Sequence, residues 1–235
     1  MATDREDSSQ QFLKAYSDPD AVAHYADGLR RFVPGLEALH RMTGILLAER
    51  VPQDALVLDL GAGGGLELKA LADTYPGWRF VGVDPSAEML RLAAQTMGSH
   101  AARAEFVEGY IDDAPQGLFD AAVCLLTLHF LDVAERTRTA REIRRRLKPG
   151  APFVAAHSSF PQAPDARERW LSRYAAYAVA SGADRDQVDK AREAVAAGAN
   201  LFSPEQDESI LRSAGFADVS LFYAAFTWRG WIAYA

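Results

Sequence analysis

Apolar positions along the chain follow two alternating spacings, and the alternation predicts a parallel α/β sheet. Short continuous apolar runs are typical of strands buried on both faces, whereas apolar residues three and four positions apart are typical of helices. The expected strands span residues 55–60, 80–83, 104–107, 119–126 and 152–157. The expected helices between them span residues 66–74, 86–97 and 133–147. This order specifies an α/β fold with a doubly wound, Rossmann-like sheet.

The segments outside this core predict additions to a single domain that spans residues 1–235. Residues 1–50 are expected to form an N-terminal helical cap, with helices over 12–31 and 36–50. Residues 51–160 form the cofactor-binding core, and the Ala-rich residues 161–202 form a helical insertion after the fifth strand. Residues 203–235 complete a mostly parallel seven-stranded sheet with a last helix and a reversed strand pair, 219–223 and 226–233, that supplies an antiparallel edge strand.

The composition limits the kinds of partner that the protein is expected to bind and the cellular compartment in which it is expected. Lys and Arg number 25 against 32 Asp and Glu, so the net charge of −7 argues against a nucleic-acid partner or an anionic membrane surface. The single cysteine excludes an internal disulfide, and no Cys/His spacing predicts a metal. The polar N-terminus and the lack of a long apolar run predict a cytoplasmic protein.

A glycine-rich turn follows the first predicted strand, in the sequence VLDLGAGGG. Gly61, Gly63 and Gly65 stand where a buried strand gives way to a helix. Such a turn requires positive φ and close backbone approach, and it lies at the carboxyl edge of the sheet, where ligands bind. Gly61, Ala62 and Gly63 are therefore candidate ligand-binding residues.

The charge beside this turn predicts which ligand binds. Asp59 precedes Gly61 by two residues, and its carboxylate would repel a pyrophosphate but attract an ammonium or a sulfonium. S-adenosylmethionine carries both cations and no phosphate. The GxGxG spacing also departs from the GxGxxG pattern of nicotinamide dinucleotide sites. The turn therefore favours S-adenosylmethionine over a nicotinamide cofactor, and a turn without a ligand is weaker still, because three glycines cost stability.

Two further turns complete the predicted cofactor site. Asp84 ends the second strand, 23 residues after Gly61, where an acid accepts hydrogen bonds from a ribose diol or caps the next helix. Pro85 and Met89 on the following segment are expected to contact the same ligand. In the sequence EGYIDD, Tyr110 or Ile111 is expected to cover the adenine, unless this segment is an ordinary acidic loop.

Residues 50–160 resemble the class I S-adenosylmethionine-dependent methyltransferases. The resemblance rests on VLDLGAGGG, FVGVD, EGYIDD, FDAAVCLLTLHFL and RRRLKPGAPFVAAH, in that order. A finer resemblance, through VPGL, TLHFL, LKPGA, KAR, SAGF and a final aromatic hairpin, is to the carboxy-S-adenosylmethionine synthase branch. The resemblance implies an enzyme, and for that branch a homodimer that makes a carboxylated cofactor from S-adenosylmethionine and prephenate.

The chain departs from that branch at the positions that hold the extra carboxylate of the carboxylated cofactor. The branch's arginine aligns with Arg192, which is expected to bind a carboxylate of substrate or cofactor or to remain a solvated helix charge. Its tyrosine and asparagine align with Leu36 and Leu125, and the aspartate after its EG pair aligns with Tyr110. These changes predict a more apolar acceptor pocket, with Leu125 against the cofactor.

Catalytic candidates are few, because a sulfonium methyl group is already activated and the protein mainly orients it. His129, after the fourth strand, is the candidate general base, with a packing or capping role as its alternative. His157 is a weaker candidate. Tyr16 and Tyr25 are expected to stack or hydrogen-bond near the sulfonium, with Tyr25 as a cofactor residue. His24 lies with Tyr25 in the N-terminal helices that are expected to cover the cofactor. The aromatics of the insertion line an acceptor pocket or form its core: Trp170, Tyr174 and Tyr177.

The predicted function is methyl transfer from S-adenosylmethionine to a small or medium organic molecule. Carboxy-transfer chemistry, or use of a carboxylated cofactor, is the first alternative, supported by Arg192 and opposed by Leu36 and Leu125. A non-catalytic S-adenosylmethionine-binding module is the second, because the case for a base is weak. A nicotinamide oxidoreductase is opposed by the glycine spacing and by Asp59.

Overall fold

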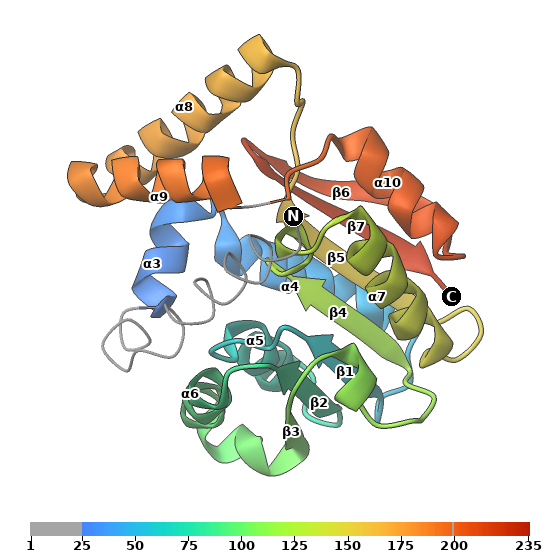
Figure 1. The fold of residues 1–235 in the computed structure, drawn as a ribbon. Coiled ribbons are helices and arrows are strands. Elements are labelled where there is room, and N and C mark those ends of the chain that lie inside the picture. Colours follow the sequence, from blue (N-terminus) through green and yellow to red (C-terminus); the bar gives the residue numbers. More distant parts are fainter. Residues whose placement is uncertain (1–24, 199) are drawn as a thin grey trace.

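A seven-stranded sheet of order β3-β2-β1-β4-β5-β7-β6 forms the centre of the protein (Figure 1). The computed structural model describes residues 25–198 and 200–235. Five strands are parallel, and β7 runs antiparallel to both β5 and β6. The strands are β1 (Leu56–Leu60), β2 (Arg79–Asp84), β3 (Ala104–Glu108), β4 (Ala121–Leu125), β5 (Pro152–Ser158), β6 (Ala217–Ala225) and β7 (Trp228–Tyr234). The predicted doubly wound sheet with a closing strand pair is confirmed.

Helices cover both faces of the sheet, and each face has its own apolar core. The first core packs the sheet against α4 (Leu36–Ala48), α5 (Leu66–Thr74) and α6 (Ala87–Met97). The second packs it against α7 (Val133–Arg145) and α10 (Pro204–Ser213). Val57 of β1 belongs to the first core and Leu58 to the second. Because successive side chains point to opposite faces, a strand covered on both sides needs a continuous apolar run.

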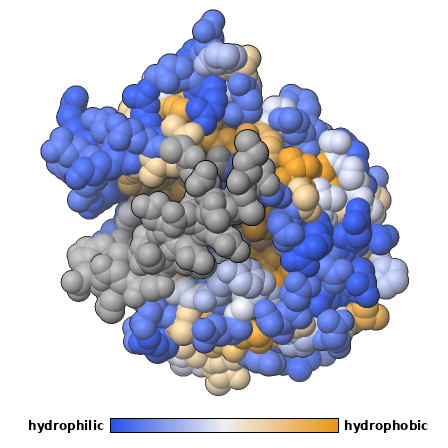
Figure 2. Space-filling model, viewed as in Figure 1, coloured by the Kyte–Doolittle hydropathy of each residue, from blue (hydrophilic) through white to orange (hydrophobic). Residues whose placement is uncertain are grey.

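Three helices gather at the carboxyl edge, the side toward which the β4 arrowhead points in Figure 1: α3 (Tyr25–Phe32), α8 (Pro164–Ala180) and α9 (Arg185–Gly198). Together α8 and α9 form the predicted insertion, here called the α8–α9 arm. Phe32 of α3 packs against Tyr174 of α8, with ring centroids 5.4 Å apart. On the face seen in Figure 2, the outside of the arm is largely hydrophilic, and hydrophobic surface gathers beside it near the middle of the molecule.

The predicted elements differ from the structure mainly at their ends. Short 3₁₀ segments that the pattern did not predict occupy Gly98–Arg103, Ile111–Asp113 and Leu128–Phe130; they are too short to show a period. Phe119 makes only an isolated bridge to Leu147, so β4 begins later than predicted. Phe226 lies in a turn with a φ of 50°, and β7 begins after it. Ser203 and Gln206 form a capping box at the start of α10.

Candidate functional site

The glycine turn between β1 and α5 has the positive-φ backbone that its sequence predicts. The φ angles of Gly61, Gly63 and Gly65 are 80°, 47° and 73°. A Cβ on Gly61 would lie 2.1 Å from Thr127 Oγ1, and one on Gly65 would lie 2.8 Å from Ala93 Cα. Glycine is thus needed at both positions for sterics as well as for φ. The third glycine provides close packing of α5 on α6.

Asp84, at the end of β2, holds this turn in place. Its Oδ2 accepts a hydrogen bond from Gly63 N at 3.0 Å, and its Oδ1 accepts one from Ser86 N at 2.9 Å. The cap of α6 is Ser86, whose Oγ accepts from Met89 N at 3.2 Å. Burial raises the pKa of Asp84, while the two backbone hydrogen bonds oppose that shift. Each carboxylate oxygen keeps a second lone pair for a ligand hydroxyl.

Asp59, on β1 below the turn, is a buried acid without a hydrogen-bonding partner in the part of the chain that the structure describes. Its side chain is 0 % exposed, and neither carboxylate oxygen has a hydrogen bond to any residue that the structure describes. Burial raises the pKa of Asp59 well above its usual value, and the nearby acids Glu67 and Asp84 raise it further. An unpartnered buried acid of this kind is satisfied by a bound cationic ligand or by a proton.

Glu67, in the first turn of α5, is an acidic residue of this site that sequence reasoning missed. It is 8 % exposed, and burial raises its pKa to about 8, with Asp84 adding to the shift. Leu68, Leu71 and Ala72 of the same helix are buried in the first core. An acid beside the apolar positions of a helix that follows a glycine turn is the signal that could have identified it.

The neighbouring loops place the remaining cofactor candidates in different surroundings. Tyr110 is 55 % exposed beside the edge, whereas Ile111 is buried in the second core. Tyr110 N donates to Asp113 Oδ2 at 2.8 Å, which fixes the start of this loop. Met89 is buried, and Pro85 is half-buried. Register pairing of Asp84 with Glu108 brings this loop next to the glycine turn.

The carboxyl end of β4 is strained. Leu125 is buried there, and the following Leu126 has a φ of 57°, an uncommon conformation for a residue with a branched side chain. Thr127 Oγ1 donates to Leu125 O at 3.0 Å while it packs on Gly61. Backbone strain of this kind clusters at ligand and active sites.

His129, the candidate base, is buried two residues after Thr127. It is 6 % exposed, its ring lies edge-on to Trp228 at 5.7 Å, and Nδ1 has no hydrogen-bonding partner among the described residues. Burial lowers the pKa of His129 well below its usual value, and the positive charge of Arg136 contributes. The imidazole is therefore neutral at neutral pH, as a general base must be.

A buried charged network links the elements behind His129. Arg136 of α7 pairs with Asp207 of α10 at 2.5 Å, and His157 Nε2 of β5 lies 3.2 Å from the same Asp207 oxygen. Arg136 also donates to Leu131 O at 3.1 Å and to Asn200 O at 2.6 Å. The network joins the segment that carries His129 to the end of the insertion. In the sequence, Arg136 cannot be told from the exposed arginines of the same charged helix.

Arg192 lies in the α8–α9 arm, where it forms an ion pair with Glu168. Its guanidinium is thus bound to a carboxylate of the chain itself. Leu36 is buried in the first core at the start of α4. Tyr25 begins α3, but its side chain, like all of Tyr16 and His24, lies outside the described residues.

The insertion aromatics meet both the core and the final hairpin. Tyr174 is buried in the first core, and Tyr177 lies 5.8 Å from Phe226, centroid to centroid. Trp170 has Arg173 over its ring at 4.6 Å and Arg229 at 5.4 Å. Tyr223 Oη donates to Pro34 O, and Trp228 Nε1 donates to Phe32 O. The hairpin and α3 therefore form one wall at the carboxyl edge.

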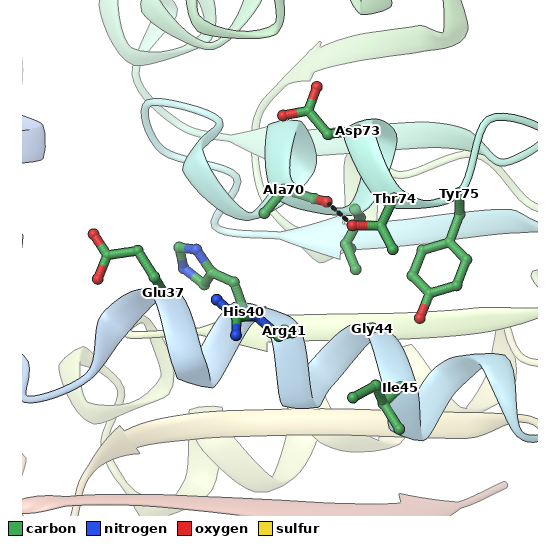
Figure 3. A pocket seen from close by; sticks show the side chains of 10 residues that line it. Glu37, His40, Arg41, Gly44, Ile45, Ala70, Asp73, Thr74 and Tyr75 are labelled. Carbon is green, nitrogen blue, oxygen red and sulfur yellow. Dashed lines mark hydrogen bonds between the residues drawn. The ribbon is translucent and has the colours of Figure 1, made fainter.

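A separate pocket of about 290 Å³ opens between α4 and α5 (Figure 3). Its lining includes His40, Arg41, Gly44, Thr74 and Tyr75. None of the predicted cofactor residues whose side chains the structure describes lines it. His40 is 7 % exposed, and burial lowers its pKa to about 4.

The described residues contain no helix long and apolar enough to cross a membrane. They also contain no group of three or more His, Cys, Asp or Glu arranged to hold a metal ion.

Comparison with known proteins identifies the domain in the middle of the chain. A family model described as "Methyltransferase domain" matches residues 57–150, the segment from β1 to the turn before β5. This segment is a methyltransferase domain. The chain is 29 % identical to the carboxy-S-adenosyl-L-methionine synthase of Chromohalobacter salexigens over 229 residues, which cover 92 % of the chain and 82 % of that protein.

Solved structures share the fold of this protein. PigF, solved with SAH, matches 94 % of the chain with a TM-score of 0.67 and 20 % identity. Human N-acetylserotonin methyltransferase, solved with SAM, matches 95 % of the chain with a TM-score of 0.62 and 20 % identity. The chain spans 61 % and 58 % of those two proteins. The resemblance predicted from the sequence motifs is confirmed at the level of family and fold.

Proposed function

We propose that the protein binds S-adenosylmethionine at the glycine turn and transfers its methyl group to a small or medium organic acceptor. One observation carries the proposal: the buried carboxylate of Asp59 has no described hydrogen-bonding partner and lies under three positive-φ glycines at the carboxyl edge of the sheet. A cationic ligand satisfies that carboxylate, whereas a pyrophosphate would be repelled by it.

Each candidate residue has a distinct role in this proposal. The free lone pairs of Asp84 would accept hydrogen bonds from the ribose hydroxyls while its existing bonds keep the turn in shape. Gly61, Ala62 and Gly63 would allow the ligand to approach the backbone. Tyr110, which is exposed beside the turn, would cover the adenine, and Leu125 and Met89 would contribute apolar surface.

Methyl transfer asks the protein mainly for orientation. When bound, the cofactor supplies a methyl group on a sulfonium, which is already activated for in-line displacement. The wall formed by α3, the α8–α9 arm and the β6–β7 hairpin would exclude water and align the acceptor. His129 would take a proton from an acceptor hydroxyl or amine, because its imidazole is neutral. His129→Asn should then slow turnover and leave the affinity for S-adenosylmethionine unchanged.

Carboxy-transfer chemistry is the second candidate, because the chain matches a carboxy-S-adenosyl-L-methionine synthase over 92 % of its length. Against it, Leu36 and Leu125 stand where the resemblance implies polar contacts, and Arg192 is paired with Glu168. Mass spectrometry of the ligand that copurifies with the protein separates the two candidates. A carboxylated nucleoside would favour the second, and S-adenosylmethionine or S-adenosylhomocysteine would favour the first.

Both candidate functions require that the protein binds S-adenosylmethionine, and isothermal titration calorimetry tests that binding. S-adenosylmethionine should bind in the micromolar range, and NADH should not bind. Absence of binding and of any thermal shift at millimolar S-adenosylmethionine would contradict the proposal, as would tighter binding of NADH.

We also propose that the protein is a cytoplasmic homodimer that acts on small molecules rather than on nucleic acid. Sedimentation velocity tests whether it is a dimer.

A further inference from the structure

The acids around the glycine turn have an unusual charge balance. Asp59 on β1, Glu67 on α5 and Asp84 on β2 influence one another electrostatically, and Cys124 on β4 is near enough to feel the charge of the first two. No lysine, arginine or histidine of the described residues forms an ion pair with Asp59 or Glu67. Among the described residues, Asp84 accepts two backbone hydrogen bonds that stabilise a negative charge, from Gly63 N and Ser86 N. A backbone hydrogen bond at Glu67 opposes the effect of burial on the pKa of that group but does not outweigh it.

Burial prevents two of these acids from both being charged in the free protein. Asp59 is 0 % exposed, with neither oxygen hydrogen-bonded to a described residue, and Glu67 is 8 % exposed. Isolated carboxylates in such surroundings take up a proton rather than stay ionised, and like charges close together strengthen that tendency. Burial accordingly raises the pKa of both groups, that of Glu67 to about 8.

A ligand with a net positive charge would reverse this balance. The sulfonium and ammonium groups attract negative charge, so a bound cation stabilises the ionised form of nearby acids. We infer that Asp59 and Glu67 hold a proton between them in the free protein, that binding of S-adenosylmethionine releases it, and that Glu67 thereby helps to select a cationic ligand. This inference rests on the proposed function.

The linkage between proton release and ligand binding gives the direction in which the affinity for S-adenosylmethionine changes with pH. The free protein binds more protons than the complex, so the affinity for S-adenosylmethionine rises with pH. The rise should approach about tenfold per pH unit below pH 8 and level off above it, where Glu67 ionises without ligand. The ammonium group of the ligand also titrates near this range, and its contribution has the opposite sign.

Calorimetry in buffers of different ionisation enthalpy measures the released proton directly. At pH 7 the wild-type protein should release about one proton per S-adenosylmethionine bound. Glu67→Gln should release less than half as much, because the amide cannot hold the proton. Since ligand titration is the same for both proteins, the difference between them reports Glu67. Glu49→Gln, at an exposed position on the end of α4, is the matched control and should behave as wild type.

Infrared difference spectroscopy gives a second measurement that needs no substitution. A protonated-carboxyl carbonyl band should disappear from the wild-type protein when S-adenosylmethionine binds. Tight binding with no buffer dependence and no loss of this band would overturn the inference and leave the proposed function intact. Absence of binding would overturn both.

Discussion

The hydroxyl of Thr127, after β4, occupies the space that a side chain at Gly61 would need. A Cβ on Gly61 would lie 2.1 Å from Thr127 Oγ1 and 2.8 Å from Thr127 Cβ. The φ of Gly61 is 80°, which is itself unfavourable for any other residue. The turn and the strained end of β4 are therefore fitted to each other.

Gly61→Ala should destabilise the protein by about 3 kcal/mol, because it adds a steric clash to the cost of positive φ. Chemical denaturation measures this loss. Gly150→Ala is the matched control: its φ is 75°, but a Cβ at this position would have no atom within 4 Å, so only about 1–2 kcal/mol should be lost. Equal losses for the two variants would contradict the role given to Thr127.

Asp84→Asn should weaken S-adenosylmethionine binding by about tenfold to a hundredfold, because a charged acceptor of hydrogen bonds is lost. The amide would also direct an N–H group toward Gly63 N or Ser86 N, which now donate to the carboxylate. Titration calorimetry gives the affinity, and circular dichroism checks the fold. An unchanged affinity in a folded variant would exclude Asp84 from the site.

Asp207→Asn should cost about 3–5 kcal/mol of stability, because it leaves the buried Arg136 without its anion. The double variant Arg136→Met, Asp207→Leu should recover most of that loss. Lys69→Met is the control, since its partner Asp73 is about half exposed and the pair should contribute under about 1 kcal/mol. Denaturant unfolding of the wild-type protein and the three variants measures these losses of stability.

The carboxylate of Asp207 also predicts how the free energy of unfolding changes in acid. Burial raises the pKa of Asp207, but His157 and Arg136 outweigh that effect, so the pKa lies below 3.8. Its stabilising contribution is present above pH 3.8 and is lost as pH falls through the lower, native-state value. Unfolding free energies between pH 6 and 3 should thus fall for the wild-type protein and change less for Asp207→Asn. Parallel curves would contradict this assignment.

The burial of His40, in the pocket between α4 and α5, predicts a second effect of pH on stability. Burial lowers its pKa from 6.5 to about 4, with Arg30 adding to the shift and Glu37 opposing it. The unfolded chain therefore binds a proton that the folded protein resists, and about 3 kcal/mol should be lost between pH 6.5 and 4. His40→Gln should flatten the stability curve in that range. An unchanged slope would show that His40 does not carry the effect.

Local pattern and backbone chemistry determined much of this protein before any tertiary contact was known. The order of strands and helices, the positive-φ turn at Gly61 and the acid at Asp59 follow from hydrophobic period and glycine spacing. These features depend on residues near one another in the chain. A single sequence therefore contains the information needed to predict them.

Only the tertiary structure decided which side chains meet across the chain. Arg136 and Asp207 stand 71 positions apart, and nothing in the charged run around Arg136 distinguishes it from its exposed neighbours. Glu67 gains its role from burial beside Asp59, and Arg192 is held by Glu168 rather than left free. Burial and pairing set the charge state of each group, and both depend on packing between elements distant in sequence.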